Sequence, residues 1–213
     1  MTNKGLFISF EGVEGSGKTT QLQRLYTFLL ELGLDVIQTK EPGGTSVGQS
    51  LRHMILDATQ PLKHRYTEVF LFYADRLEHL ETVVKPALLE GKIVLCDRYI
   101  DSTYAYQVGG RQIPFSMIET LNDMIDMVLP ELTILLDLDP EQGIDRVKKR
   151  SAMDRFEQEA LSFHHRVRET YLRLMPKYPA RMVKIDVKDQ TEDEVFEKIK
   201  PMVQSFLKKK GKI

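Results

Sequence analysis

Short apolar runs rich in β-branched residues recur along the chain and alternate with longer segments of helical periodicity. These runs, which predict five strands, lie at 6–10, 35–39, 92–96, 132–138 and 182–186. They show little alternation of polar and apolar positions, which is typical of strands in a parallel sheet covered on both faces. The pattern therefore predicts an α/β fold of three layers, with a five-stranded parallel sheet between helices.

The segment 65–90 has the most unusual of the helical patterns. Its stretch EVFLFYADRLEHL is apolar over more of its circumference than one core-facing stripe requires. The additional face is expected to contact either a ligand or a second subunit, because large apolar faces are rarely left in water.

Length and composition limit the possible classes of protein. A chain of 213 residues suits one α/β domain, so we expect a single domain over 1–213. Thirty basic and 31 acidic residues give a net charge of -1, which provides no overall attraction to nucleic acid or to an anionic membrane. One cysteine, Cys96, excludes a disulfide framework and a cysteine metal site.

The chain is expected to be cytoplasmic, with no nucleic-acid or membrane partner. No apolar run reaches the roughly 18 to 20 residues that span a bilayer. The stretch MTNKGLFISF does not have the charged region, apolar stretch and cleavage site of a signal peptide.

The stretch GVEGSGKT at 12–19 follows the first predicted strand and precedes a helical pattern. It matches G-x-x-x-x-G-K-[ST], in which backbone N–H groups and a helix N-terminus surround a phosphate. Lys18 is expected to bridge the β- and γ-phosphates of ATP, and Thr19 to offer its hydroxyl to Mg²⁺. The predicted ATP-binding residues are Gly12, Glu14, Gly15, Ser16, Gly17, Lys18, Thr19 and Thr20. The loop alone does not separate a kinase from a GTPase or a motor ATPase.

Asp97 and Arg98 come directly after the strand 92–96, at the edge where open α/β sheets bind ligands. Asp97 is expected to hold Mg²⁺ through water, and Arg98 to face a second phosphate. An ion pair between the two is less favoured, because neighbouring residues of an extended chain point to opposite faces.

Three further stretches contain candidate binding groups. The turn after strand 35–39 contains Glu41 and is followed by a helical pattern with Arg52, although a plain connecting loop remains an alternative. Phe72 and Arg76 share one helical face. The ring could stack on a base while the guanidinium donates to a base oxygen, or the pair could be a core phenylalanine beside a solvated arginine.

A basic run suits either a solvated helix face or a mobile lid at about 146–158. Its cations are Arg146, Lys148, Lys149, Arg150 and Arg155.

Five stretches in this order, EGVEGSGKTT, EPGGT, FYADR, DRYIDSTYAYQ and DRFE, closely resemble the bacterial thymidylate kinases. The resemblance covers about residues 6–187. It implies a P-loop NTPase fold with a mobile lid, and transfer of the ATP γ-phosphoryl group to dTMP with Mg²⁺ by a homodimer. The extra apolar face of the helix 66–80 is then assigned to the dimer.

The resemblance also implies roles for individual residues. Glu14 accepts a hydrogen bond from the 3′-hydroxyl of dTMP, which explains a carboxylate within a phosphate loop. Phe72 stacks on thymine, Arg76 bonds its O4, and Thr103 and Gln107 reach the base edge. The other residues assigned to the acceptor site are Glu41, Arg52, Arg98 and Tyr106, the last favouring deoxyribose.

The predicted catalytic residues are Lys18, Arg98, Arg150 and Glu14. Relatives with a basic residue after the acidic one in the loop use it in catalysis, but this chain has Gly15 there. A lid cation is expected instead, with Arg150 favoured over Lys148, Lys149 and Arg155.

Two other functions are compatible with the phosphate loop. A deoxynucleoside kinase needs a carboxylate base for a 5′-hydroxyl, whereas Arg52 with Arg98 favours an acceptor that already has a phosphate. A non-enzymatic nucleotide switch would hydrolyse ATP slowly and bind a partner protein, and the apolar helix 66–80 is the one feature of the sequence that favours it.

Overall fold

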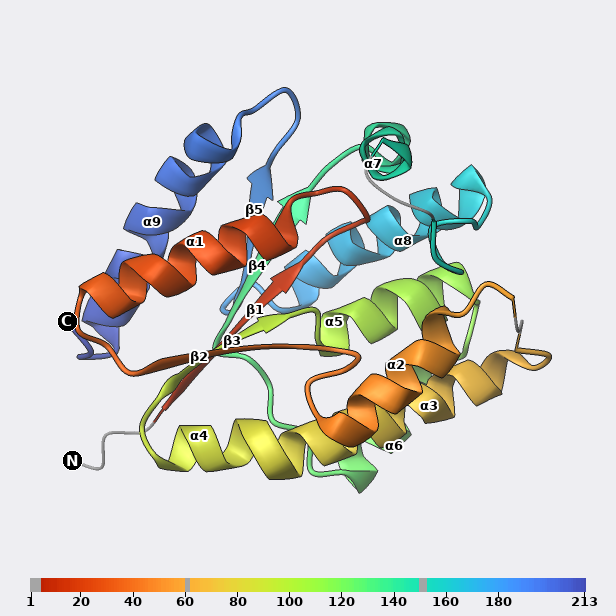
Figure 1. The fold of residues 1–213 in the computed structure, drawn as a ribbon, viewed down its shortest axis with the longest axis horizontal. Coiled ribbons are helices and arrows are strands. Elements are labelled where there is room, and N and C mark those ends of the chain that lie inside the picture. Colours follow the sequence, from red (N-terminus) through yellow and green to blue (C-terminus); the bar gives the residue numbers. More distant parts are fainter. Residues whose placement is uncertain (1–4, 60–61, 150–152) are drawn as a thin grey trace.

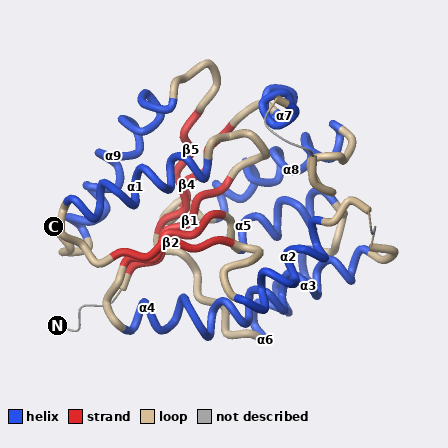
Figure 2. The backbone as a smooth tube through the Cα atoms, viewed as in Figure 1, coloured by secondary structure: helices blue, strands red, loops and turns tan. Residues whose placement is uncertain are grey.

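The computed structural model describes residues 5–59, 62–149 and 153–213, and its centre is one parallel sheet (Figures 1 and 2). The strands are β1 Leu6–Glu11, β2 Val36–Lys40, β3 Ile93–Asp97, β4 Leu132–Asp137 and β5 Met182–Asp186. All neighbouring pairs are parallel, in the order β2-β3-β1-β4-β5. The five predicted strands are confirmed, each within one residue at either end.

Helices connect the strands and cover both faces of the sheet (Figure 1). The α-helices of the described ranges are α1 Lys18–Glu31, α2 Ser46–Leu56, α3 Arg65–His79, α4 Lys85–Leu89, α5 Ile100–Thr103, α6 Phe115–Met124, α7 Pro140–Lys148, α8 Leu161–Leu174 and α9 Glu192–Lys209. Two π-helical segments are η1 Leu80–Val84 and η2 Tyr104–Gly110, and a 3-10 segment is η3 Met175–Lys177. Among the helices of these ranges, none combines the length and apolar character that a bilayer crossing demands.

The central strand β1 contributes to the core on both sides of the sheet. Leu6, Ile8 and Phe10 pack in one cluster with apolar side chains of α1 and α9. Phe7 packs in a second cluster with side chains of η1, α4 and α6. Because successive strand side chains point to opposite faces, a strand between two helical layers needs apolar residues on both faces, and the buried polar Ser9 of β1 is hydrogen-bonded to Thr133.

The segment 65–90 forms α3, η1 and α4. Two features of α3 account for the apolar residues spread widely around this helix. The large apolar side chains of Phe70 and Leu77 stay 55% and 42% exposed. The buried side of α3 instead includes four polar residues, Glu68, Asp75, Arg76 and His79. Polar groups thus face the interior, while an apolar face remains on the surface.

The carboxyl ends of β1, β2 and β3 lie at one level, since Phe10 and Lys40 are both in register with Asp97. The Arg98 N–H donates to the Phe10 carbonyl at 2.9 Å, and the Glu41 N–H donates to the Asp97 carbonyl at 3.0 Å. These bonds bring the phosphate loop, the turn after β2 and the end of β3 together at the ligand-binding edge of the sheet.

Candidate active site

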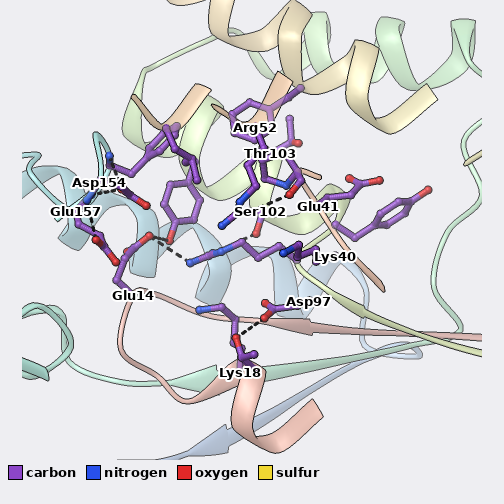
Figure 3. A pocket seen from close by; sticks show the side chains of 18 of the residues that line it. Glu14, Lys18, Lys40, Glu41, Arg52, Asp97, Ser102, Thr103, Asp154 and Glu157 are labelled. Atoms are coloured by element: carbon purple, nitrogen blue, oxygen red, sulfur yellow. Dashed lines mark hydrogen bonds and ion pairs between the residues drawn. The ribbon is translucent and has the colours of Figure 1, made fainter. Parts of the chain in front are cut away.

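A pocket of about 320 Å³ lies at this edge of the sheet (Figure 3). The predicted residues that line it are Glu14, Gly15, Gly17, Lys18, Thr19, Thr20, Glu41, Arg52, Phe72, Arg76, Asp97, Arg98, Thr103, Tyr106 and Gln107. Gly12 and Ser16 lie next to it, where the Gly12 carbonyl and the Ser16 hydroxyl accept from Lys18. Arg150 lies outside the described residues. One cavity therefore unites the groups predicted for donor and acceptor.

The phosphate loop depends on glycine at the position after Glu14. Gly15 has a φ of 68°, in the left-handed region that favours glycine. A Cβ added there would lie 2.3 Å from the Gly143 carbonyl oxygen of α7. Glycine thus permits both the turn of the loop and its close packing against α7.

Lys18, the first residue of α1, is largely buried beside the loop. Its ammonium donates to the carbonyls of Gly12 and Val13 at 3.1 and 2.9 Å. Burial and the nearby charge of Arg98 lower the pKa of Lys18 to about 8. Lys18 therefore remains mainly charged at neutral pH, next to the helix N-terminus that favours an anion.

Thr19 and Asp97 form the candidate metal site. The Thr19 hydroxyl donates to Asp97 Oδ2 at 2.6 Å, and both residues line the pocket. A hydroxyl and a carboxylate side by side, with phosphate oxygens and water as further ligands, suit the preference of Mg²⁺ for oxygen. These two residues fit the predicted ion.

The Glu14 carboxylate is held by three side chains. Arg98 Nη2 donates to it at 3.2 Å, the Tyr106 hydroxyl donates at 2.5 Å, and His164 Nδ1 lies 3.4 Å away. Burial alone raises the pKa of Glu14, but the His164 contact and the charges of Arg98 and Lys18 outweigh it and lower the pKa to about 2. The loop therefore presents a carboxylate that is ionised at neutral pH and can accept a hydrogen bond.

Arg98 lies in the left-handed region, with φ of 66°, as the chain leaves β3. Its Nη1 donates to the Gly12 carbonyl at 3.0 Å, and its guanidinium lies 4.9 Å from the Tyr106 ring centroid. The strained backbone directs the Arg98 guanidinium into the site, where the phosphate loop and the Tyr106 ring restrict the position of the guanidinium.

Behind Arg98 lies Glu11, a buried carboxylate that the sequence interpretation did not identify. It accepts from the Ser102 hydroxyl at 2.6 Å and the Tyr171 hydroxyl at 2.8 Å, and Ser102 also accepts from Arg98. Burial, reinforced by the charge of Asp101, raises the pKa of Glu11 to about 7. Glu11 thus supports Arg98 through an intervening hydroxyl.

Arg76 is 1% exposed and is fixed at two of its nitrogens. Its Nε donates to Glu41 at 2.8 Å, and its Nη1 donates to Thr103 Oγ1 at 2.9 Å. The second Glu41 oxygen lies 2.8 Å from His79 Nδ1. Glu41 therefore orients Arg76, in addition to lining the pocket.

The remaining acceptor-site residues also have defined contacts. Gln107 Nε2 donates to Glu68 at 2.9 Å, and Arg52 Nη1 donates to the Pro42 carbonyl at 2.8 Å. The Phe72 ring lies 6.0 Å from that of Phe156, measured between centroids. Phe72 and Phe156 together form an aromatic part of the pocket wall.

The stretch DRFE lines the site through residues that had no assigned role. Asp154, Phe156 and Glu157 border the pocket. Asp154 accepts from the N–H groups of Phe156 and Glu157 at 2.8 and 2.9 Å, which shapes a tight turn. Arg155 donates to the Ile55 carbonyl and to Glu68, so it contributes to packing rather than extending into the pocket.

The sequence matches the family model described as thymidylate kinase over residues 10–199. The chain belongs to the thymidylate kinase family. The thymidylate kinase of Clostridium novyi (strain NT) is 43% identical over 201 residues, 93% of this chain and 98% of the relative. That of Acholeplasma laidlawii (strain PG-8A) is 44% identical over 194 residues, 90% and 95% of the two chains.

A crystal structure of the thymidylate kinase from Ehrlichia chaffeensis is similar in fold. It aligns with a TM-score of 0.77 and 35% sequence identity, over 93% of this chain and 98% of that one. Membership of the thymidylate kinase family confirms the predicted fold and enzyme class, and it does not favour a deoxynucleoside kinase or a nucleotide switch.

Proposed function

We propose that the protein transfers the γ-phosphoryl group of ATP to dTMP, giving ADP and dTDP for the synthesis of dTTP. The observation that carries this proposal is the composition of one pocket. Lys18 of the phosphate loop, the paired Glu14 and Arg98, and the aromatic and cationic side chains of Phe72 and Arg76 line the same cavity. A nucleotide acceptor can therefore lie against the phosphates of a nucleotide donor.

On the donor side, the phosphate loop binds the ATP phosphates, and Lys18 bridges the β- and γ-phosphates. Mg²⁺ held by Thr19 and, through water, by Asp97 would neutralise charge on these phosphates. The N-terminus of α1 adds a partial positive charge.

On the acceptor side, Arg52 and Arg98 hold the dTMP phosphate. Glu14 accepts from the 3′-hydroxyl, and Tyr106, which donates a hydrogen bond to Glu14, favours deoxyribose. The base is bound by side chains of α3, α5 and η2, which are Phe72, Arg76, Thr103 and Gln107.

A dTMP phosphate oxygen attacks the γ-phosphorus in line with the oxygen that bridges the β- and γ-phosphates. The new P–O bond forms as the old one breaks, and the bridging oxygen leaves with its electron pair on ADP. No strong base is required, because the attacking oxygen is already anionic. The chain contributes position and positive charge through Lys18, Arg98 and the lid residue Arg150.

The single domain over 1–213 closes its lid, about residues 146–158, over the donor. The protein acts as a homodimer in the cytoplasm, and the exposed face of α3 with Phe70 and Leu77 forms part of the contact. An apolar face of this kind is stabilised when a second copy removes it from water.

A deoxynucleoside kinase is less well supported by the site. Such an enzyme needs a free carboxylate base, but Glu14 is hydrogen-bonded to Arg98 and Tyr106, and Glu41 to Arg76 and His79. The other carboxylates that line the pocket also accept hydrogen bonds, Asp97 from Thr19, Asp154 from two backbone N–H groups and Glu157 from the Asp154 N–H.

The direct test is ADP release from ATP and Mg²⁺ with four acceptors: dTMP, dUMP, the ribose analogue of dTMP, and thymidine. We expect fast turnover with dTMP and none with thymidine. Equally slow ADP release with all four acceptors would overturn the proposal and favour a nucleotide switch.

A further inference from the structure

Glu68 of α3 is 1% exposed and contacts the pocket residue Gln107. Its carboxylate also accepts from Arg111 Nε at 3.1 Å and from Arg155 Nη1 at 2.8 Å. Two guanidinium groups thus compensate its buried charge. A carboxylate in this environment offers acceptors only.

This acceptor-only character dictates how Gln107 is oriented. An amide has a donor end and an acceptor end, and the two are similar in shape. Because Glu68 can only accept, Gln107 must direct its Nε2 toward Glu68, as the 2.9 Å bond shows. The amide oxygen of Gln107 is then the end left for a ligand.

Arg76 is the complementary group. Its Nε is bonded to Glu41 and its Nη1 to Thr103, and every nitrogen of a guanidinium is a donor. The pocket therefore combines a fixed donor, Arg76, with a fixed acceptor, Gln107.

We infer that Glu68 sets the base selectivity of the enzyme by fixing the amide orientation of Gln107. A pyrimidine with a 4-carbonyl and an N3–H complements a donor and an acceptor, whereas cytosine presents a 4-amino donor and an N3 acceptor. Glu68 is a positioning residue, since it acts on the base through Gln107. The inference rests on the proposed function and deepens it.

The neighbouring carboxylate Glu159 provides a matched control. It pairs with Arg111 through a different nitrogen and belongs to the same charged cluster, whereas the Gln107 amide donates to Glu68. Glu159→Gln removes a carboxylate from the cluster without changing the partner of the Gln107 amide.

Glu68→Gln tests the inference, because an amide at position 68 can donate to the Gln107 oxygen and so allow Gln107 to turn. The kcat/KM values for dTMP, dUMP and dCMP are measured for the wild type and both variants, with dissociation constants where dCMP turnover is too slow. We expect Glu68→Gln to lower the preference for dTMP over dCMP at least about tenfold, since a mismatched buried hydrogen bond is costly. The dTMP to dUMP ratio should stay constant, because both bases share the same edge, and Glu159→Gln should keep both ratios.

An equal loss with all three nucleotides would overturn the inference, because it would show that Glu68 only supports packing. A wild type that does not phosphorylate dTMP would instead overturn the proposed function. Melting temperatures report whether each variant folds. Should Glu68→Gln not fold, Glu68→Asp and Glu68→Asn repeat the comparison of carboxylate with amide; equal selectivity in that pair would likewise refute the inference.

Discussion

The Arg98 guanidinium donates to the Glu14 carboxylate at 3.2 Å, and this ion pair joins the phosphate loop to the end of β3. The pair explains how an acidic side chain is tolerated within a loop that binds anions. Arg98 balances its charge, and Tyr106 satisfies the same oxygen. The carboxylate can then serve the acceptor nucleotide without repelling the donor.

Glu14→Gln is expected to impair the use of dTMP more than that of ATP. The substitution preserves shape but removes the charge that accepts from Arg98, Tyr106 and the acceptor hydroxyl. Hydrogen bonds to charged groups are worth about 1.5–3 kcal/mol, so kcat/KM for dTMP should fall about 10- to 100-fold. Steady-state kinetics with each substrate varied check this, with exposed Glu81→Gln on η1 as the control. A larger change in the KM for ATP than in kcat/KM for dTMP would contradict it.

Glu14 should also contribute to stability in a defined pH range. Its pKa falls from 4.5 to about 2 on folding, because the His164 contact and the charges of Arg98 and Lys18 outweigh burial. A lowered pKa stabilises the folded state fully above about pH 4.5, and this stabilisation is lost as the pH falls toward 2. The difference in melting temperature between wild type and Glu14→Gln should therefore be constant from pH 7 to 5 and shrink below it. A difference in melting temperature that stays constant down to pH 2.5 would show that ionisation of Glu14 does not stabilise the folded state.

The sequence predicts the residues of the pocket wall better than those behind it. The phosphate loop has a local spacing, and the strand that precedes it has a local apolar pattern. Glu11 and Glu68 have no such signal, since their partners are distant in sequence: Glu11 bonds Tyr171, 160 residues away, and Glu68 bonds Arg155, 87 residues away. Only the folded chain shows which buried carboxylates support the site.

The helix α3 shows a related limit of hydrophobic patterns. A period of 3.6 residues predicts a helix over this segment, but not which side faces inward. Here buried Arg76 and His79 are satisfied by Glu41, while Phe70 is exposed. Burial of polar groups depends on partners from other elements, which periodicity does not register.

Gly15→Ala should destabilise the protein more than an ordinary glycine substitution. Gly15 has a φ of 68°, and an added Cβ would meet the Gly143 backbone oxygen at 2.3 Å. Gly33 has a φ of 74° and no atom within 4 Å of an added Cβ. Gly33→Ala is therefore a control that measures the cost of backbone strain alone, about 1–2 kcal/mol. Denaturant unfolding should therefore rank Gly33→Ala above Gly15→Ala in stability. Equal stabilities would show that α7 can move away from the loop.

Phe70→Glu should weaken self-association. Phe70 and Leu77 are exposed apolar residues on one side of α3, and a charge there would have to be desolvated in the proposed dimer. Light scattering after size exclusion should show a shift from dimer toward monomer. Leu89→Glu is the control, because Leu89 on α4 is 87% exposed and outside the proposed contact. A Phe70→Glu variant that remains dimeric would show that the dimer contact lies elsewhere on the surface.

Arg150→Ala should reduce turnover with little effect on folding. Two other cations of the basic run are already engaged, since Arg146 donates to the Gly15 carbonyl and Arg155 to Glu68. A supplied arginine that stabilises the transferring phosphoryl group is worth about 10³-fold or more in rate, so kcat should fall by about this factor. Lys149→Ala, which removes the preceding exposed cation, should have a small effect in the same assay. If the two variants lose activity equally, the lid acts through its overall charge; if Arg150→Ala folds and keeps near wild-type turnover, the lid cation is a different residue.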